Sequence, residues 1–381
     1  MNDQAIVIGG GIIGLSTCFE YQEAGFQVTL IDRDPISGAT QHAGGMLAPM
    51  SEVQYQQSEL QGLMKASARL YPDLIRRVRR HTDLPTGYRT NGTLLVGADR
   101  ADATHLGNLL RHMEFEDAAV DPLTIREARA LEPALSPRIS KALSIEGDHQ
   151  LDPRLFTRAL LDAVISRGAE LIQDSVLSID GHNPCRTLTL ASGVRVASKS
   201  TVVLAAGLGA AKIPGWFSAK NPLNLRPVYG DIMRVRVPES MQPLISKVVR
   251  GFVEDRPVYL IPREDGSLTI GASSREDSPQ PRTGAIHDLL RDAIRLVPGI
   301  ADTEFMEATC GARPGTPDDM PYLGRVGSNL IISTGYFRHG ILLAALAAKT
   351  AVDLTLEKQT LTYINACNPL RHAPEFSRMT P

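Results

Sequence analysis

Three glycines near the start of the chain have the spacing of a dinucleotide-binding turn. Gly9, Gly11 and Gly14 form a Gly-x-Gly-x-x-Gly pattern. An apolar run at residues 5–8 predicts a strand before this pattern, and residues 12–24 predict a helix that begins within it. In such a turn the glycines permit a tight bend, a close approach to a pyrophosphate, and close packing of helix on strand. The phosphates would meet free N–H groups at the N-terminus of the helix.

A carboxylate follows at the place where the ribose of a dinucleotide would lie. Residues 27–32 predict a second strand, and Asp32 is its last residue. A carboxylate there accepts hydrogen bonds from ribose hydroxyls and disfavours a 2′-phosphate. Strand, helix and strand make a βαβ unit, which implies a parallel sheet. The pattern predicts dinucleotide binding but does not distinguish NAD from FAD.

Three further segments favour FAD. Residues 39–46 are rich in small side chains and follow the second strand directly, which suits a chain that runs along a pyrophosphate and a flavin. A predicted buried strand at residues 201–207 ends in two alanines and Gly207, a second place of close approach. A strand at residues 329–334, a glycine and a helical run at residues 339–356 predict a second helix N-terminus. Its dipole would stabilise the negative charge of a reduced flavin.

The pattern of apolar and turn-forming residues changes in the second half of the chain. Runs at residues 228–237, 249–261 and 267–272 alternate with turns and predict an antiparallel sheet, with a hairpin turn at residues 264–266. We therefore predict an α/β fold in which a Rossmann-like FAD-binding domain with a parallel sheet is interleaved with a smaller α+β substrate domain built on an antiparallel sheet. The predicted FAD-binding domain comprises residues 1–85, 141–222 and 308–381, and the predicted substrate domain comprises residues 86–140 and 223–307. Additional elements are expected as helices at residues 58–80 and 154–167 and as a strand at residues 91–98.

Composition excludes several classes of function. The 381 residues have a formal net charge of −2, so no basic field would attract nucleic acid. The four cysteines are scattered without a Cys-x-x-Cys pair, which predicts neither a metal site nor a redox dithiol and fits a reducing compartment. The apolar run at residues 5–13 has no basic residue before it and is interrupted by glycines, so we expect no signal peptide. No membrane segment is expected, and a cytoplasmic location is predicted.

Five segments spread over the chain carry a specific combination of motifs. They are IVIGGGIIG at residues 6–14, GGMLAP at 44–49, YLIPR at 259–263, GARPGTPD at 311–318 and GYFRHGILLA at 335–344. Together they resemble the glycine oxidase branch of the D-amino-acid oxidase family of flavoproteins, and the resemblance covers nearly the whole chain. It implies a non-covalently bound FAD, a small amino-acid substrate, O2 as electron acceptor, and a homo-oligomer, which in this family is a tetramer.

The resemblance also implies which side chains meet the substrate. Arg313 and Tyr259 would hold its carboxylate, and Arg338 would lie nearby. A guanidinium offers a planar fork of donors that matches a carboxylate in two parallel bonds. The alternatives are a structural Arg313 paired with Asp318 or Asp319, a core tyrosine at position 259, and a helix-end or interface arginine at position 338.

The residues expected to line the FAD come from five stretches of the chain. The glycine pattern and the end of the strand at 201–207 contribute Gly9, Gly11, Gly14 and Gly207. By resemblance, further contacts come from Ile12, Ile13, Asp32, Arg33, Ala39, Thr40, Gly44, Gly45, Met46 and Val176. The segment expected to pass along the flavin ring consists of Tyr336, Phe337, Arg338, His339, Gly340, Ile341 and Leu342.

Three positions depart from the family pattern. His339 stands where close relatives often have a polar amide, and Ser274 stands near a pocket position that can carry methionine. Cys310 lies in a region where the related sarcosine oxidases have a cysteine that tethers the flavin. Because its neighbours follow the glycine oxidase pattern, we interpret Cys310 as a small buried residue.

The implied reaction needs little acid–base machinery. Arg313 and Tyr259 would place the α-carbon of glycine over flavin N5, and the neutral amine would assist hydride departure as an imine forms. Oxygen would yield hydrogen peroxide, and the imine would give glyoxylate and ammonia or supply the thiazole of thiamine. The alternatives are a D-amino-acid dehydrogenase, a sarcosine-type amine oxidase, and either a non-catalytic dinucleotide-binding protein or a flavin domain that acts on a macromolecule.

Overall fold

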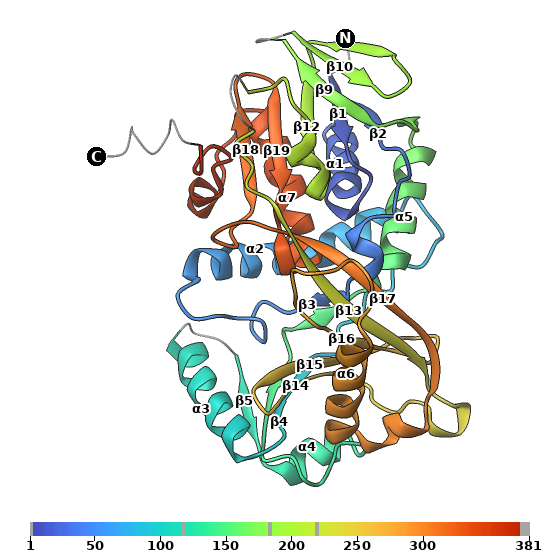
Figure 1. The fold of residues 1–381 in the computed structure, drawn as a ribbon, viewed down its shortest axis with the longest axis vertical. Helices are drawn as coiled ribbons and strands as arrows, with labels where there is room; N and C mark the ends of the chain where they lie inside the picture. The colour runs from blue at the N-terminus through green and yellow to red at the C-terminus, as the bar shows by residue number, and fades with distance from the viewer. Residues whose placement is uncertain (1–2, 116–118, 182–184, 218–220, 374–381) are drawn as a thin grey trace.

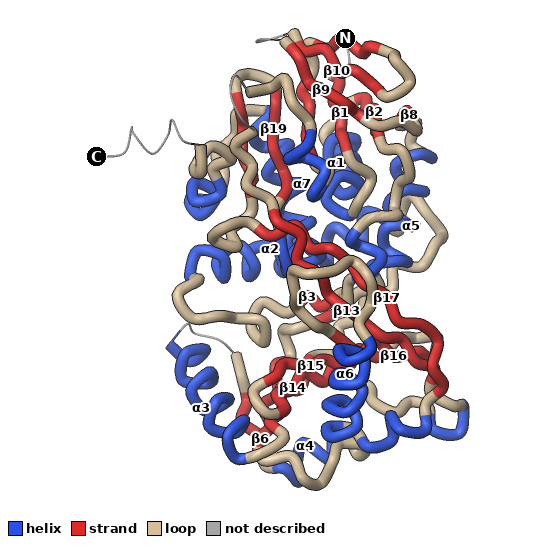
Figure 2. Tube along the Cα trace, viewed as in Figure 1, coloured by secondary structure: helices blue, strands red, loops and turns tan. Residues whose placement is uncertain are grey.

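The computed structural model describes residues 3–115, 119–181, 185–217 and 221–373. Two large sheets dominate it, one toward each end of the longest axis of the molecule (Figure 1). The helices α1, α2, α5 and α7 gather around the six-stranded sheet, and α3, α4 and α6 flank the eight-stranded sheet (Figure 2). Among the described residues, no helix combines the length and apolar character that crossing a bilayer requires.

The six-stranded sheet has the order β18-β19-β12-β1-β2-β8. Its strands pair in parallel except at the edge, where β18 runs antiparallel to β19. The predicted βαβ unit at the N-terminus is confirmed by the pairing of β1 with β2. The bounds are β1 (Gln4–Ile8), β2 (Gln27–Ile31), β8 (Glu170–Ile172), β12 (Thr201–Leu204), β18 (Tyr322–Val326) and β19 (Leu330–Thr334).

Both faces of this sheet are covered, because successive strand residues point to opposite sides. Ala5 and Val7 of β1 join one core cluster with the helices, whereas Ile6 and Ile8 join another with the small sheet β11-β10-β9. Because both faces of this sheet are buried, nearly every residue of its central strands must be apolar. The bounds are α1 (Ile12–Glu23), α2 (Ser58–Val78), α5 (Pro153–Ser166), α7 (Gly340–Thr355), β9 (Val176–Asp180), β10 (Arg186–Leu190) and β11 (Arg195–Ser198).

The eight-stranded sheet has the order β17-β13-β16-β15-β14-β4-β6-β5. All of its pairs are antiparallel except β14 with β4. The strands are β4 (Thr93–Gly97), β5 (Asp121–Leu123), β6 (Lys141–Ile145), β13 (Arg226–Arg236), β14 (Val248–Val253), β15 (Arg256–Pro262), β16 (Ser267–Gly271) and β17 (Glu304–Gly315). Flanking it are α3 (Arg100–Phe115), α4 (Ile125–Leu131) and α6 (Thr283–Leu296).

Short elements complete the structure. Strands β3 (Met46–Leu47) and β7 (His149–Gln150) pair with each other. The 3-10 helices are η1 (Ala39–His42), η2 (Gly207–Lys212), η3 (Glu239–Met241), η4 (Pro298–Asp302), η5 (Phe337–His339) and η6 (Thr362–Cys367).

One predicted strand was wrong in its extent. Residues 249–261 form two strands, β14 and β15, joined at Glu254 and Asp255. Both residues have positive φ, 52° and 62°, as a two-residue hairpin turn requires, although neither is the glycine or asparagine that usually signals one. The predicted turn at 264–266 is confirmed, because β15 and β16 pair on either side of it.

The predicted domain boundaries stay a prediction, and two of them do not coincide with the limits of a sheet. Strand β17 runs across the boundary between residues 307 and 308, and β6 begins at residue 141. Both strands pair within the eight-stranded sheet, which otherwise holds the predicted substrate segments.

Candidate active site

A cavity of about 600 Å³ lies where the two sheets meet. Its wall includes Gly9 and Ser333 beside the six-stranded sheet, and Gly230, Tyr259 and Arg313 on the eight-stranded sheet. A cavity of this size, lined by both sheets, is typical of a cofactor and substrate site.

The glycine turn after β1 allows backbone to approach backbone. Gly9 has a φ of +111°, and a Cβ there would lie 2.5 Å from the carbonyl oxygen of Ala205. A Cβ at Gly14 would overlap the carbonyl oxygen of Gly9. A larger residue at either position would force β1, α1 and β12 apart. The close packing predicted for these glycines is therefore present.

Asp32 closes this turn. Its carboxylate accepts hydrogen bonds from the backbone N–H of Gly10 at 2.6 Å and of Asp34 at 2.8 Å, and it also lines the cavity. A carboxylate has about four acceptor sites, so two bonds leave capacity for a ligand hydroxyl.

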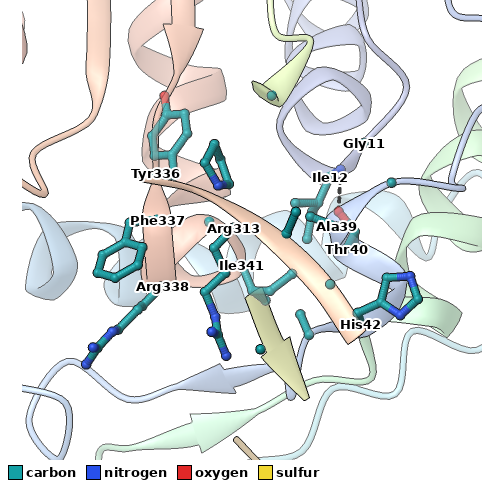
Figure 3. A pocket seen from close by; sticks show the side chains of 18 of the residues that line it. Gly11, Ile12, Ala39, Thr40, His42, Arg313, Tyr336, Phe337, Arg338 and Ile341 are labelled. Atoms are coloured by element: carbon teal, nitrogen blue, oxygen red, sulfur yellow. Dashed lines mark hydrogen bonds between the residues drawn. The ribbon is translucent and has the colours of Figure 1, made fainter. Parts of the chain in front are cut away.

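Two helices begin at the cavity wall, and in neither does the N-cap residue cap the helix with its own side chain. Helix α1 starts after Gly11, and the N–H of Ile12 donates to Thr40 Oγ1 at 3.3 Å (Figure 3). Helix α7 starts at Gly340, and its N-cap His339 makes no side-chain cap bond. Gly340 and Ile341 line the cavity. Uncapped N–H groups and the helix dipole attract negative charge, so both helix ends fit the pyrophosphate and the flavin of FAD.

Most residues predicted to contact FAD or substrate lie in this one wall. These are Gly9, Gly11, Ile12, Ile13, Asp32, Ala39, Thr40, Gly44, Gly45, Met46, Gly207, Tyr259, Arg313, Tyr336, Phe337, Arg338, Gly340 and Ile341. Their roles toward the two ligands stay predictions.

Five predicted residues lie outside the wall. Gly14, His339 and Leu342 are its chain neighbours, and Gly14 packs directly behind Gly9. Arg33 is exposed, and Val176 is buried in the core cluster on the far face of the six-stranded sheet. The position of Val176 in the sequence does not show on which side of the six-stranded sheet its side chain lies, so its distance from the cavity could not be predicted.

Arg313 lies on β17 with its guanidinium against Gly230, where a Cβ would overlap it. Its Nη1 donates to the carbonyl oxygen of Ser273 at 3.1 Å. The alternative partners are engaged elsewhere, since Asp318 pairs with Arg371 at 2.8 Å and Asp319 with Arg226 at 3.3 Å. Arg313 has no ion pair among the described residues and keeps donors for a ligand.

Tyr259 lines the same cavity, and the charge of Arg313 acts on its hydroxyl. A Cβ at Gly44 would lie 2.8 Å from the Tyr259 hydroxyl, so this residue must be very small for the phenol to fit. Burial raises the pKa of Tyr259, and the positive charge of Arg313 opposes that effect only in part. The hydroxyl is therefore protonated at neutral pH, and it has no hydrogen-bond partner within the described part of the chain. It is available as a donor to a carboxylate.

Two charged residues of the wall were not predicted. Arg250 of β14 stands directly opposite Tyr259 of β15, and its Nη1 donates to Glu52 Oε1 at 3.0 Å. His339 Nδ1 lies 3.7 Å from the other Glu52 oxygen. Burial would raise the pKa of Glu52, but His339, Arg250 and Arg338 together hold it below its usual value. Recognition of the turn at 254–255 would have given the register that places Arg250 beside Tyr259.

A buried ion pair supports the segment that holds Arg313. Asp231 is fully buried, and Arg275 donates to its two oxygens at 3.0 and 2.8 Å. Ser273 Oγ donates to Asp231 at 2.7 Å, and its carbonyl accepts from Arg313. Cys310 adjoins this pair and is half-buried at the wall, where burial and Asp231 raise the pKa of its thiol to about 11.

Comparison with known proteins finds relatives along nearly the whole chain. The glycine oxidase of Geobacillus kaustophilus is 31% identical over 376 residues, which cover 96% of each chain. The bifunctional protein ThiO/ThiG of Trichormus variabilis is 31% identical over 94% of this chain but only 54% of its own length. This chain thus spans about half the length of that relative.

The crystal structure of glycine oxidase from Geobacillus kaustophilus is similar in fold. It superposes with a TM-score of 0.87 at 29% identity and covers 97% of this chain and 100% of the other. This likeness confirms the predicted fold class. The family described as FAD dependent oxidoreductase matches residues 4–354. The chain therefore belongs to this family of FAD dependent oxidoreductases, and FAD is its cofactor.

Proposed function

We propose that this FAD-dependent oxidoreductase oxidises small amino acids, with glycine as the reference substrate and sarcosine and small D-amino acids as relatives of it. The observation that carries the proposal is Arg313, a cavity-lining guanidinium without a carboxylate partner among the described residues, in the same wall as the Tyr259 hydroxyl, on which its charge acts. We call the part of the cavity around these two side chains the substrate end.

The chain's own residues do the binding and the orienting. Arg313 donates a forked pair of hydrogen bonds to the substrate carboxylate, and Tyr259 donates a third. Together they hold the α-carbon in one place, and such positioning accounts for much of catalysis when the cofactor carries the chemistry. The glycine turn at residues 9–11 and the segment from Tyr336 to Ile341 would hold FAD, which would supply the redox chemistry as acceptor of the hydride from the α-carbon, with O2 as the final acceptor and hydrogen peroxide as product. The imine product hydrolyses in water to glyoxylate and ammonia.

The similarity to ThiO/ThiG and to glycine oxidase supports a wider assignment. The imine of glycine would then serve the synthesis of the thiamine thiazole, in the cytoplasm, from a homo-oligomeric enzyme. A D-amino-acid dehydrogenase and a sarcosine-type oxidase would bind the substrate carboxylate in the same way. The preferred amine and the electron acceptor therefore distinguish these two enzymes from a glycine oxidase.

The test uses the purified holoenzyme with glycine, sarcosine, D-alanine and D-proline, and with methylamine as the matched amine without a carboxylate. We expect peroxide from the amino acids and very little from methylamine. Flavin reduction without peroxide would identify a dehydrogenase instead. If no amino acid reduces the flavin of a fully loaded enzyme under anaerobic conditions, the proposed function is wrong.

A further inference from the structure

The substrate end of the cavity carries more guanidinium groups than carboxylates. Arg250, Arg313 and Arg338 all line the cavity, whereas Glu52 is the acidic residue that accompanies them in its described wall. Asp32 and Asp34 also line the cavity, but they belong to the glycine turn, where Asp32 accepts from the Gly10 N–H.

Glu52 neutralises one of these three cations. It pairs with Arg250 at 3.0 Å, and the Arg250 side chain is only 14% exposed, so this is an enclosed ion pair. Neither Arg313 nor Arg338 has a carboxylate within ion-pair distance among the described residues. Two positive charges therefore remain without a partner at this end.

Arg338 is held at the opening of the cavity. Its guanidinium lies 5.0 Å from the centre of the Phe337 ring, a cation–π contact that orients it without using its N–H groups. It is exposed and makes no hydrogen bond to any described residue. Figure 3 shows Arg338 and Arg313 on the same side of the cavity, away from Gly11 and Thr40.

The two free guanidinium groups repel each other. Partial removal from water at the cavity wall and the like charge of the neighbouring Arg313 lower the pKa of Arg338, and the negative charges of Glu52 and Asp319 oppose this effect only in part. The carboxylate of glycine or sarcosine neutralises one cation and leaves the other unpaired. A ligand with two carboxylates neutralises both.

We propose that Arg313 and Arg338 form a two-anion pocket, and that the preferred substrates are amino acids with a second carboxylate. The α-carboxylate binds Arg313, and the second carboxylate, carried on the amine nitrogen or on the side chain, binds Arg338. This inference rests on the proposed function and names the substrate class within it.

The experiment compares substrates that differ only in the second acid. Sarcosine, iminodiacetate and the monoamide of iminodiacetate form one series, in which the monoamide matches the diacid in size but lacks its charge. D-Alanine and D-aspartate form a second pair. For the native holoenzyme we expect kcat/KM to be about tenfold higher for iminodiacetate than for its monoamide. That ratio equals about 1.4 kcal/mol, near the low end for a hydrogen bond to a charged group, as suits an exposed guanidinium.

The variant Arg338→Gln keeps length and hydrogen-bonding capacity but removes the charge. We expect it to abolish the preference for the diacid, so that the ratio of kcat/KM for iminodiacetate to kcat/KM for its monoamide, measured within the variant, falls to about one. The matched control is Arg195→Gln, an equal change of charge at an exposed site on β11, and it should retain the native ratio. A native ratio near one, or an equal loss for mono- and diacids in Arg338→Gln, would overturn the two-anion pocket.

A binding measurement separates this inference from the proposed function. Malonate and acetate are titrated into the holoenzyme, and the change in flavin absorbance gives each Kd. We expect malonate to bind about tenfold more tightly than acetate in the native protein and equally in Arg338→Gln. If no amine is oxidised but this preference holds, the proposed function fails and the pocket stands. If amino acids are oxidised but malonate has no advantage, the pocket is wrong and the function stands.

Discussion

Substitution of Arg313 separates the charge of the proposed carboxylate anchor from its geometry. The guanidinium gives one N–H to the Ser273 carbonyl at 3.1 Å and has further donors free for a substrate. Loss of one partner from a desolvated charge pair costs about 2–5 kcal/mol. Because Arg313 is half-buried, we expect Arg313→Ala to cost about 3 kcal/mol in kcat/KM for glycine, which is about 150-fold. Arg313→Lys keeps the charge and loses the fork, so a smaller loss of about tenfold is expected.

The assay is peroxide formation from glycine and from methylamine, with FAD content read from the visible absorbance. Both variants should bind FAD as the native protein does, and methylamine, already a poor substrate, should be nearly indifferent to the changes. Arg195→Ala serves as the control, since this exposed residue lies outside the cavity wall. An Arg313→Ala protein that retains its FAD and oxidises glycine within threefold of the native kcat/KM would refute the anchor.

Three further variants or treatments test other parts of the site. Gly230→Ala places a Cβ into the Arg313 guanidinium, so KM for glycine should rise while the visible spectrum of bound FAD stays native; an unchanged KM would show that Arg313 does not act from this position. Asp32→Ala should weaken FAD binding by about 1.5–3 kcal/mol through the lost charge-assisted bonds, measured by equilibrium dialysis, and equal affinity in the variant would contradict the ribose assignment. Acid precipitation should release FAD into the supernatant, because the raised pKa of Cys310 keeps its thiol protonated and poorly nucleophilic at neutral pH. Flavin retained in the precipitate, and released in Cys310→Ser, would reveal a covalent tether instead.

Much of the six-stranded sheet could be predicted because its signals are local. Residues 5–8 and 201–204 are short apolar runs bounded by small residues, and buried parallel strands need that texture. The helix at residues 12–23 follows from the glycine pattern that opens it. The order of the strands, with β12 inserted between β1 and β19, depends on contacts among distant segments and leaves no trace in any one of them.

The eight-stranded sheet was harder to predict because its turns and cross-strand pairs are less visible. The turn at Glu254 and Asp255 uses positive φ without glycine, so the run at 249–261 looked continuous. Because this turn was missed, the pairing of Arg250 with Tyr259 was not predicted. The ion pair of Glu52 with Arg250 was missed as well, because the two residues are far apart in the chain. Motifs pointed to Arg313 as the proposed anchor, but only the fold shows which charges surround it.

The position of Arg313 depends on neighbouring groups in and behind the cavity wall. Asp231 is fully buried, and burying a carboxylate costs several kcal/mol unless it is paired and hydrogen-bonded. Arg275 supplies two bonds and Ser273 a third, so the charge is well satisfied. These bonds tie β13 to the segment after β16 at the point where the Ser273 carbonyl accepts from Arg313.

The next residue along β13 completes the arrangement from the other side. Gly230 precedes Asp231 and presents no side chain, which leaves room for the Arg313 guanidinium to lie flat against the strand. The Ser273 carbonyl and the backbone of Gly230 therefore restrict Arg313. Both depend on one stretch of β13, because Gly230 lacks a side chain and the next residue, Asp231, accepts a hydrogen bond from Ser273. Held in this way, Arg313 needs no acidic partner to fix its position. Its positive charge therefore remains available for the proposed binding of a substrate carboxylate.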